Sequence, residues 1–284
     1  MPPLTPAEIQ QAVRAALAED IGSGDATTLA TVPESARAIG LLRAREPLVL
    51  AGLELAVAVF RELDAAAQVE RRAQDGQRLA AGEAALRISG PARVLLTAER
   101  VALNFVQHLS GIATLTARFV AAVQGTGARV LDTRKTMPGW RRFEKYAVAC
   151  GGGQNHRFGL FDQILIKDNH LVALRDALPN PIAAAVQRAR SAFPHLKIEV
   201  EADTLEQVRH AAVAGADIIL LDNMDVAALC EAVRIVAGRA RTEASGGVNL
   251  ETVRAIAGTG VDFISVGALT HSACAADLGL DFEL

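Results

Sequence analysis

The sequence predicts an α/β protein in two parts, an N-terminal α+β layer followed by a parallel α/β barrel. Three observations lead to this fold class. The chain has 284 residues, which is enough for one large or two ordinary domains. Up to about Gly111 it mixes short apolar strands with helical patterns. Beyond Gly111 short apolar strands alternate regularly with helical segments, which is typical of a parallel sheet.

The first part begins with a capped helix. Thr5 is the expected N-cap, Pro6 is the first helical position and Glu8 closes a capping box, so a helix is predicted to about Ala18. Glycines and short polar residues over 19–27 predict a tight loop. The remaining apolar patterns predict strands at 38–43, 69–72, 84–89 and 92–95, and helices at 53–63 and 96–109.

The second part repeats a strand-then-helix unit. Strands are predicted at 129–131, 164–166, 197–200, 217–221, 241–244 and 262–266. Helices are predicted at 181–193, 205–214, 226–236 and 250–257. Gly215, Gly238 and Gly260 stand where left-handed caps would end three of these helices.

A barrel is favoured over an open doubly wound sheet. No Gly-x-Gly-x-x-Gly follows the first strand of the second part, as a dinucleotide-binding sheet would require. Almost every strand instead ends in a residue with useful chemistry, and a barrel gathers such strand ends into one mouth. Those ends are Asp132 with Arg134, Lys167, Glu201, Asp222, Ser245, and Ser265 with Gly267.

The charge distribution predicts a pocket for an anionic small molecule. Residues 129–170 hold eight Lys or Arg, two His and four Asp or Glu, whereas the whole chain has a formal net charge of -3. A nucleic-acid-binding face would usually make the domain basic overall. We therefore expect a focused cationic site and no nucleic-acid partner.

Composition favours a cytoplasmic protein with no membrane partner. No apolar run reaches the length of about 18 residues that a membrane span needs. The N-terminal residues lack the basic start and apolar core of a signal peptide. Three scattered cysteines, Cys150, Cys230 and Cys274, show no metal-ligand spacing, which indicates a reducing compartment and no catalytic cysteine.

Two glutamates on one predicted strand raise the question of buried charge. Glu199 and Glu201 share a face because side chains alternate along a strand, and inside a small barrel that face points inward. A buried carboxylate needs a cation, and Lys135, Lys167 or Mg²⁺ are candidates. The alternative for Glu199 is a structural ion pair with a barrel lysine.

Asp222 also ends an apolar strand, and it has two interpretations. It is either a site carboxylate or an N-cap of the next helix, although Asp225 lies nearer that helix start.

Glycines after the last two strands predict a phosphate site. Backbone N–H groups at such turns can hold a phosphate without a side-chain cation, and barrel enzymes often bind phosphate at this place. Glycine is also common at strand-to-helix turns for steric reasons alone. The candidate phosphate-binding residues are Ser245, Gly246, Gly247, Ser265 and Gly267.

Several motifs in order resemble the quinolinate phosphoribosyltransferase family. They are Glu99-Arg100-Val101-Ala102-Leu103-Asn104, Ser110-Gly111-Ile112-Ala113-Thr114, Asp132-Thr133-Arg134-Lys135-Thr136, Glu144-Lys145-Tyr146-Ala147-Val148, Gly152-Gly153-Gln154-Asn155-His156-Arg157, Lys167-Asp168-Asn169-His170, Glu199-Val200-Glu201, Leu221-Asp222-Asn223 and Ser245-Gly246-Gly247. The resemblance implies an N-terminal α/β sandwich domain, residues 1–111 joined by the tail 271–284, and an incomplete parallel α/β barrel, residues 112–270. It also implies a homodimer.

The resemblance further implies a reaction and roles for the site residues. Quinolinate and phosphoribosyl pyrophosphate would give nicotinate mononucleotide, pyrophosphate and carbon dioxide, with Mg²⁺. Arginine forks suit a planar dicarboxylate, so the acceptor would be held by Arg100, Arg134, His156, Arg157 and Lys167. The catalytic residues would be Lys135, Glu201 and Asp222, the last two also serving Mg²⁺.

The resemblance implies that Arg100 reaches the acceptor pocket of the partner subunit. The alternative is that Arg100 only pairs with Glu99 or a neighbouring helix surface.

Three other functions remain open at this stage. A related phosphoribosyltransferase could use another anionic acceptor. A Schiff-base lyase could use Lys167 or Lys135, as barrel aldolases do. A barrel that only binds an anion would have no evident use for Glu201 and Asp222 opposite the cations.

Overall fold

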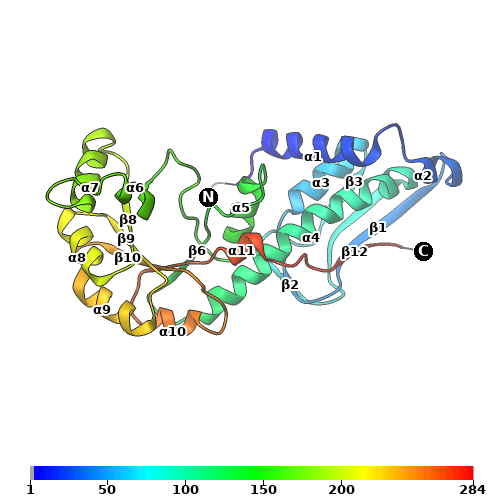
Figure 1. Ribbon diagram of the computed structural model, residues 1–284. Helices are drawn as coiled ribbons and strands as arrows, with labels where there is room; N and C mark the ends of the chain where they lie inside the picture. Colours follow the sequence, from blue (N-terminus) through cyan, green and yellow to red (C-terminus); the bar gives the residue numbers. More distant parts are fainter. Residues whose placement is uncertain (1–2, 284) are drawn as a thin grey trace. The chain divides into compact units, whose positions relative to one another are not determined.

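A computed structural model describes residues 3–283 of the chain and divides it into two compact units (Figure 1). The N-terminal unit contains the chain up to Ala117, Pro138–Gly152 and the tail from Ser272. The barrel unit contains Arg118–Met137 and Gly153–His271. The chain therefore passes between the units more than once.

The N-terminal unit combines helices with an antiparallel sheet. Its sheet has the order β12-β1-β5-β3, formed by β1 (Arg37–Ala44), β3 (Gln68–Arg71), β5 (Ala84–Pro91) and β12 (Leu278–Phe282). A small second sheet pairs β2 (Leu48–Val49) with β4 (Arg78–Leu79). Its helices are α1 (Pro6–Ile21), α2 (Ala26–Thr31), α3 (Leu53–Leu63), α5 (Arg141–Cys150) and most of α4 (Ala92–Ala122).

The predicted start of α1 is confirmed. Thr5 Oγ1 accepts from the Glu8 backbone N–H, and Glu8 in turn accepts from the Thr5 N–H at 2.7 Å, which completes the capping box. The helix continues past Ala18 to Ile21 and ends at Gly22. The loop predicted at 19–27 is therefore shorter, and Asp25 within it caps α2.

The strand predicted at 92–95 is wrong. These residues form the first turn of α4, a 31-residue helix that also runs through Gly111. A short apolar run cannot distinguish a buried strand from a buried helix segment. Here Leu95, Ala98 and Ala102 are buried at helical spacing, so packing of the helix determines the outcome.

The barrel unit is built on a six-stranded parallel sheet in the order β6-β11-β10-β9-β8-β7. Its strands are β6 (Arg129–Leu131), β7 (Ile164–Ile166), β8 (Ile198–Ala202), β9 (Ile218–Asp222), β10 (Arg241–Ser245) and β11 (Phe263–Ser265). Among the described residues β6 and β7 remain the two edges, so the sheet does not close. The predicted fold class, an α+β domain and an incomplete parallel barrel, is confirmed.

The helices of the barrel unit follow the strands. They are α6 (Asp168–Val172), α7 (Pro181–Ala192), α8 (Leu205–Ala214), α9 (Val226–Val236), α10 (Val253–Ala257) and α11 (Ala268–His271). Gly215 ends α8 in the left-handed conformation, as predicted. The left-handed cap of α9 is Ala237 rather than Gly238, and α10 ends at Gly258 in a right-handed conformation rather than at Gly260.

The compact units differ from the expected division at 111/112 over residues 112–117 and 138–152, which cluster with the N-terminal unit. Pro138–Gly152 lies in the N-terminal unit, where Trp140 stacks on Phe105 with ring centroids 5.5 Å apart. Gly151 approaches Ala113 so closely that an added Cβ would lie 2.4 Å from its carbonyl oxygen. The tail pairs with β1 through β12, so that the sheet includes both ends of the chain.

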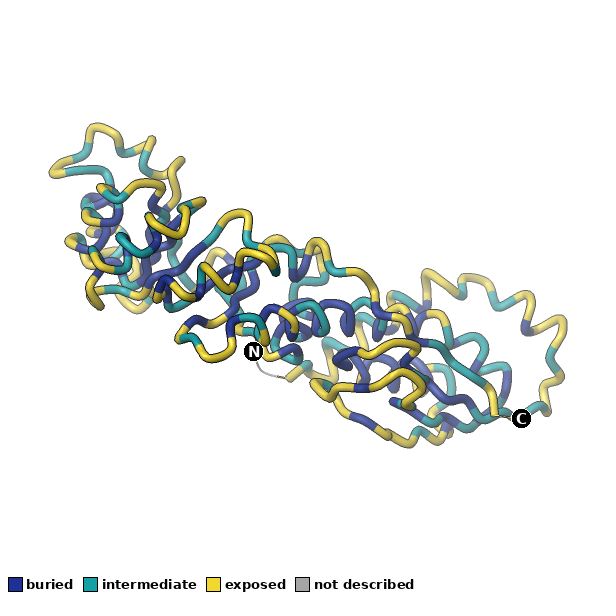
Figure 2. Tube along the Cα trace, turned by 90° about the horizontal axis from the view of Figure 1, so that it is seen from below, coloured by how far each residue is buried: buried dark blue, intermediate teal, exposed yellow. Residues whose placement is uncertain are grey.

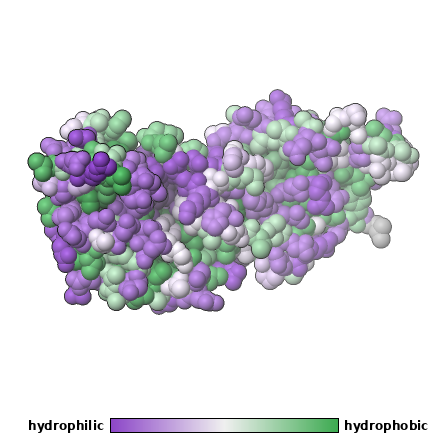
Figure 3. Space-filling model, in the orientation of Figure 1, coloured by the Kyte–Doolittle hydropathy of each residue, from purple (hydrophilic) through white to green (hydrophobic). Residues whose placement is uncertain are grey.

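Buried residues concentrate along the strands and the inner faces of the helices (Figure 2). The central strand β9 is apolar except at Asp222, with Ile219 and Leu221 fully buried. This is expected for a parallel sheet covered by helices. On the face drawn in Figure 3, hydrophilic and apolar residues are interspersed. Within residues 3–283, no helix combines the length and apolar character of a membrane span.

Candidate active site

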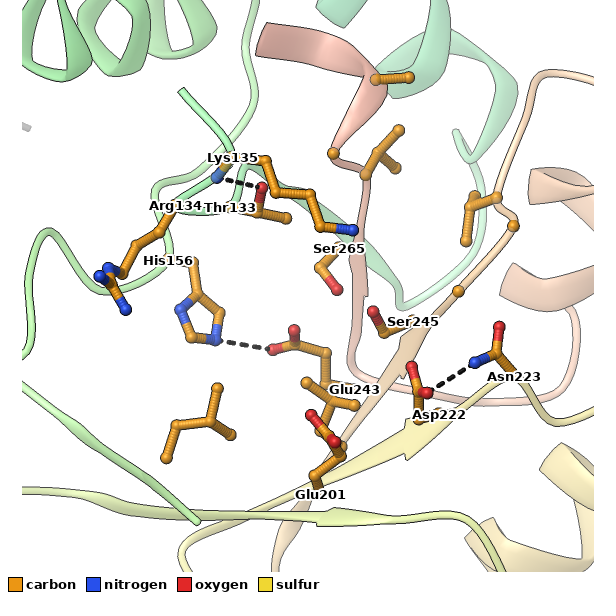
Figure 4. Close-up of a pocket in the computed structure, with 18 of the residues that line it drawn as sticks. Thr133, Arg134, Lys135, His156, Glu201, Asp222, Asn223, Glu243, Ser245 and Ser265 are labelled. Atoms are coloured by element: carbon orange, nitrogen blue, oxygen red, sulfur yellow. Dashed lines mark hydrogen bonds and ion pairs between the residues drawn. The ribbon is translucent and has the colours of Figure 1, made fainter. Parts of the chain in front are cut away.

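A cavity of about 730 Å³ lies within the barrel unit, where the carboxyl ends of its strands meet (Figure 4). Convergence of strand ends brings together residues that are far apart in sequence. The cavity is lined by every site residue predicted from the sequence except Arg100, namely Arg134, Lys135, His156, Arg157, Lys167, Glu201, Asp222, Ser245, Gly246, Gly247, Ser265 and Gly267.

The loop after β6 supplies two cations to the cavity. Thr133 Oγ1 accepts from the Lys135 N–H at 3.0 Å, and Thr270 Oγ1 donates to the Lys135 carbonyl at 2.7 Å. These bonds hold the backbone, while the Lys135 amine extends into the cavity (Figure 4). Gly267 leaves room for this side chain, since a Cβ there would lie 3.1 Å from Lys135 Cδ.

Arg134 presents an unsatisfied donor. Its Nε is buried and makes no hydrogen bond. A buried guanidinium nitrogen without an acceptor is costly, which indicates that a ligand completes the site. The pKa of nearby Arg157 is lowered, first by loss of solvation and then by the positive charge of Arg134. Two arginines held together in this way favour an anionic ligand.

His156 is turned toward acidic side chains. Its Nδ1 accepts from the Arg157 backbone N–H at 2.8 Å, and its Nε2 lies 2.9 Å from Glu199 Oε2 and 3.6 Å from Glu243 Oε2. Both ring nitrogens are thus directed at groups of the chain. His156 also lines the cavity, so its role in holding an acceptor carboxylate remains a prediction.

The acidic side of the cavity contains Glu201 and Asp222. Glu201 Oε2 lies 3.4 Å from Lys167 Nζ, which is one of the two lysine partners proposed for a barrel glutamate. Loss of solvation raises the pKa of Glu201, partly opposed by Lys167. Loss of solvation also raises the pKa of Asp222, followed by repulsion from Asp203.

Asp222 is not an N-cap. Asp225 caps α9 by accepting from the Ala228 N–H at 2.8 Å, as the sequence indicated. Asp222 instead accepts from Asn223 Nδ2 at 2.6 Å, and both side chains line the cavity (Figure 4).

Glu243 is the main site residue that sequence reasoning missed. It lies in the middle of β10, lines the cavity and is only 1% exposed. The available signal was an acid inside a predicted barrel strand, the same signal that drew attention to Glu199. Glu199 is fully buried, and its partners are His156 and Gln163 rather than the barrel lysine considered above.

The binding of a metal ion by Glu201 and Asp222 remains a prediction. Ligand atoms of His156, Glu199 and Glu243 lie within 4.8 Å of one another, whereas Glu201 and Asp222 belong to no such group of three or more. Glu201 and Asp222 are both oxygen donors at the cavity wall, which suits an ion that also binds substrate oxygens and water.

The turn after β10 has the geometry of an anion-binding loop. Gly246 and Gly247 have φ of 93° and 61°, values that L side chains rarely adopt. An added Cβ at Gly246 would lie 2.1 Å from Asn223 Oδ1, so the turn needs glycine for space as well as for conformation. The phosphate-binding role of Ser245, Gly246 and Gly247 remains a prediction.

Arg100 lies on α4 in the N-terminal unit, where it is exposed. It is near enough to Glu99 to lower that carboxyl's pKa, although loss of solvation raises the pKa more.

Comparisons with known proteins agree over the whole chain. Residues 25–110 match the family "Quinolinate phosphoribosyl transferase, N-terminal domain", and residues 112–281 match its C-terminal domain. A nicotinate-nucleotide pyrophosphorylase (carboxylating) from Mycobacterium leprae is 47% identical over 275 residues, which cover 95% of each chain.

Solved structures give the same result. NadC from Streptococcus pyogenes has a TM-score of 0.93 and 43% identity, with 100% of both chains covered. A nicotinate-nucleotide pyrophosphorylase from Francisella tularensis has a TM-score of 0.93 and 40% identity, with 99% of this chain and 98% of that chain covered. The chain therefore belongs to the quinolinate phosphoribosyltransferase family.

Proposed function

We propose that this protein transfers the phosphoribosyl group of phosphoribosyl pyrophosphate to quinolinate with decarboxylation. The products are nicotinate mononucleotide, pyrophosphate and CO₂, a step in pyridine nucleotide synthesis. The observation that carries this proposal is one cavity lined both by two arginines, Arg134 and Arg157, and by two carboxylates, Glu201 and Asp222. Relatives with 40–47% identity over most of the chain bear the corresponding names.

The arginine wall fits the acceptor. Arg134 and Arg157 offer planar forks to the two carboxylates of quinolinate, and the unpaired Nε of Arg134 is available for one of them. Lys167 adds a point charge at the mouth. The acceptor's ring nitrogen is then oriented for attack on C1 of the ribosyl group.

The carboxylate wall fits the donor. When the bond from C1 to pyrophosphate breaks, positive charge develops on the ribosyl carbon, and Glu201 and Asp222 stabilise it electrostatically. Their oxygens also suit Mg²⁺, which binds through one or two carboxylates together with substrate phosphates and water. When bound, that ion neutralises charge on the leaving pyrophosphate. Lys135 also neutralises the leaving group, and the glycine turn after β10 holds the donor's phosphate.

Decarboxylation follows from the first step. Once the ring nitrogen carries the ribosyl group it is positively charged, so C2 can release CO₂ and keep the electron pair. A proton then takes the vacated position on C2, and the balance of atoms and charge is complete. The protein's part is to orient the dicarboxylate and exclude competing water.

We further propose a cytoplasmic homodimer in which each subunit lends Arg100 to the acceptor pocket of the other. An isologous two-fold interface is reciprocal, so both pockets would be completed at once. The exposed position of Arg100 supports this, since it is available to a partner. The free state of Cys150, Cys230 and Cys274 is consistent with a reducing compartment.

The direct test is to incubate the protein with quinolinate, phosphoribosyl pyrophosphate and Mg²⁺. We expect nicotinate mononucleotide and CO₂ in equal amounts, and neither when any one substrate is omitted. Formation of a borohydride-trapped adduct on Lys135 or Lys167 would support a Schiff-base lyase instead.

A further inference from the structure

Two glutamates in the barrel interior have no role in the reaction described so far. Glu199 on β8 is fully buried and Glu243 on β10 is 1% exposed. One oxygen of each and a ring nitrogen of His156 lie within 4.8 Å of one another. Glu199 Oε1 and both oxygens of Glu243 make no hydrogen bond. Two adjacent negative charges cannot both persist there without compensation.

The surroundings of the two glutamates differ. Glu199 Oε2 faces two donors, His156 Nε2 at 2.9 Å and Gln163 Nε2 at 2.7 Å. Glu243 Oε2 lies farther from His156 Nε2, at 3.6 Å. Ser265 on β11 lies close to it, and its register partners are Leu220 on β9 and Phe263 on β11. Loss of solvation, followed by repulsion from Glu199, raises the pKa of Glu243 to about 8.

Glu199 is also part of a closed ring of hydrogen bonds with the acceptor arginine. It accepts from His156 Nε2, and His156 Nδ1 accepts from the Arg157 N–H at 2.8 Å. Arg157 Nη1 donates to the Gln163 carbonyl at 3.2 Å, and Gln163 Nε2 donates back to Glu199. Movement of Glu199 would therefore disturb both the backbone and the guanidinium of Arg157.

We propose that Glu199 and Glu243 form a positioning pair, in which Glu199 holds the His156–Arg157 ring through its contacts with His156 and Gln163, and neutral Glu243 keeps further negative charge out of the acceptor pocket. Ionisation of Glu243 then weakens binding of the dicarboxylate, by repulsion across the cavity that Glu243 lines. This inference rests on the proposed function because it takes quinolinate as the acceptor.

A proton on Glu243 accounts for the close approach of the two buried carboxyl groups better than a bound cation does. Two N–H donors already point at Glu199 Oε2, an arrangement that excludes a metal from that oxygen. Arg134 and Arg157 add positive charge to the same cavity and oppose a further cation.

The test is the pH dependence of acceptor binding in the wild type, Glu243→Gln and Glu199→Gln. In the wild type the KM for quinolinate should rise by about tenfold per pH unit above about pH 8, while the KM for phosphoribosyl pyrophosphate does not follow it. Glu243→Gln should lack this rise. Glu199→Gln should shift it to lower pH, because the neighbouring charge that opposes ionisation of Glu243 is gone. Glu251→Gln, an exposed control in the same unit, should retain the wild-type profile.

Thermal unfolding gives a readout that needs no activity. Between its ordinary pKa of 4.5 and about 8, folded Glu243 keeps a proton that the unfolded chain has lost, so wild-type stability falls as the pH rises through this interval. The Tm of Glu243→Gln minus that of the wild type should therefore grow from pH 5 to pH 8.

The outcomes separate this inference from the proposed function. Turnover of quinolinate with no difference between the wild type and Glu243→Gln in either pH profile would overturn the pair and leave the function standing. No turnover of quinolinate by the wild type would overturn the function, and the Tm series would still decide the protonation of Glu243. If calorimetry detects binding of Mn²⁺ or Zn²⁺ to the chelator-treated protein, and Glu243→Gln abolishes this binding, then a metal ion rather than a proton neutralises the pair, and the inference is wrong.

Discussion

In the proposed function, single residues divide the cavity into an acceptor wall and a donor wall, and this proposed division predicts how substitutions act. Glu201 and Asp222 are assigned to the ribosyl centre, so Glu201→Ala and Asp222→Ala should lower kcat by about 100-fold while changing the KM for quinolinate much less. Steady-state kinetics with both substrates varied would measure this. Asp176→Ala, which alters a side chain that is 93% exposed, is the control.

The opposite kinetic pattern would reassign these carboxylates. If Glu201→Ala and Asp222→Ala bind quinolinate poorly but turn over normally at saturation, both residues belong to the acceptor wall. The ion pair of Glu201 with Lys167 would then be their connection to it.

The preference for quinolinate over other acceptors should also follow from the charges of single residues. Nicotinate has one carboxylate fewer than quinolinate and would leave part of the Arg134 and Arg157 pair without a counter-charge. Because buried donors left unpaired are costly, kcat/KM for nicotinate should be lower by about 100-fold or more. Competition between the two acids in one assay measures the ratio directly, and comparable values would refute the dicarboxylate clamp.

At the scale of elements, the turn after β10 depends on contact with the turn after β9. Asn223 itself has a positive φ of 53°, and its side chain occupies the space where a Cβ of residue 246 would lie. Gly246→Ala should therefore displace Asn223, which also donates to Asp222. We expect a higher KM for phosphoribosyl pyrophosphate together with a loss of about 1–2 kcal/mol from backbone strain alone.

Substitutions at two other glycines separate the effect of crowding by Asn223 from the effect of backbone strain. Gly247 has a positive φ but nothing within 4 Å of an added Cβ, so Gly247→Ala tests strain without a clash. Gly127 has open space and no positive φ, so Gly127→Ala should resemble the wild type. Equal effects of Gly246→Ala and Gly247→Ala on the donor's KM would show that contact with Asn223 is unimportant.

At the scale of the whole molecule, the proposed exchange of Arg100 between subunits predicts complementation. Arg100→Ala and Lys135→Ala proteins should each be inactive. A mixed dimer contains one site with both defects and one with neither, so subunit exchange should restore about one intact site per mixed dimer. Native mass spectrometry can confirm that subunits have exchanged. If mixed dimers form and no activity appears, the shared site is disproved.

Most elements were predictable from local pattern because their signals are local. The capping box at Thr5, the apolar stripe of α3 and the alternation of strands and helices after Gly111 each lie within a short window of sequence. The error at residues 92–95 arose where an apolar run suits either structure. The short helices α6 and α11 were missed because their few residues show no helical period.

The sequence by itself determined the family, the fold class and many of the residues of the cavity wall, since parallel strand ends must meet at one edge. Only the tertiary structure showed that the ring of His156 lies beside Glu199 and Glu243. Only it placed Pro138–Gly152 in the N-terminal unit. The orientation of a ring and the clustering of a segment depend on neighbours distant in sequence, and local propensity carries no information about those contacts.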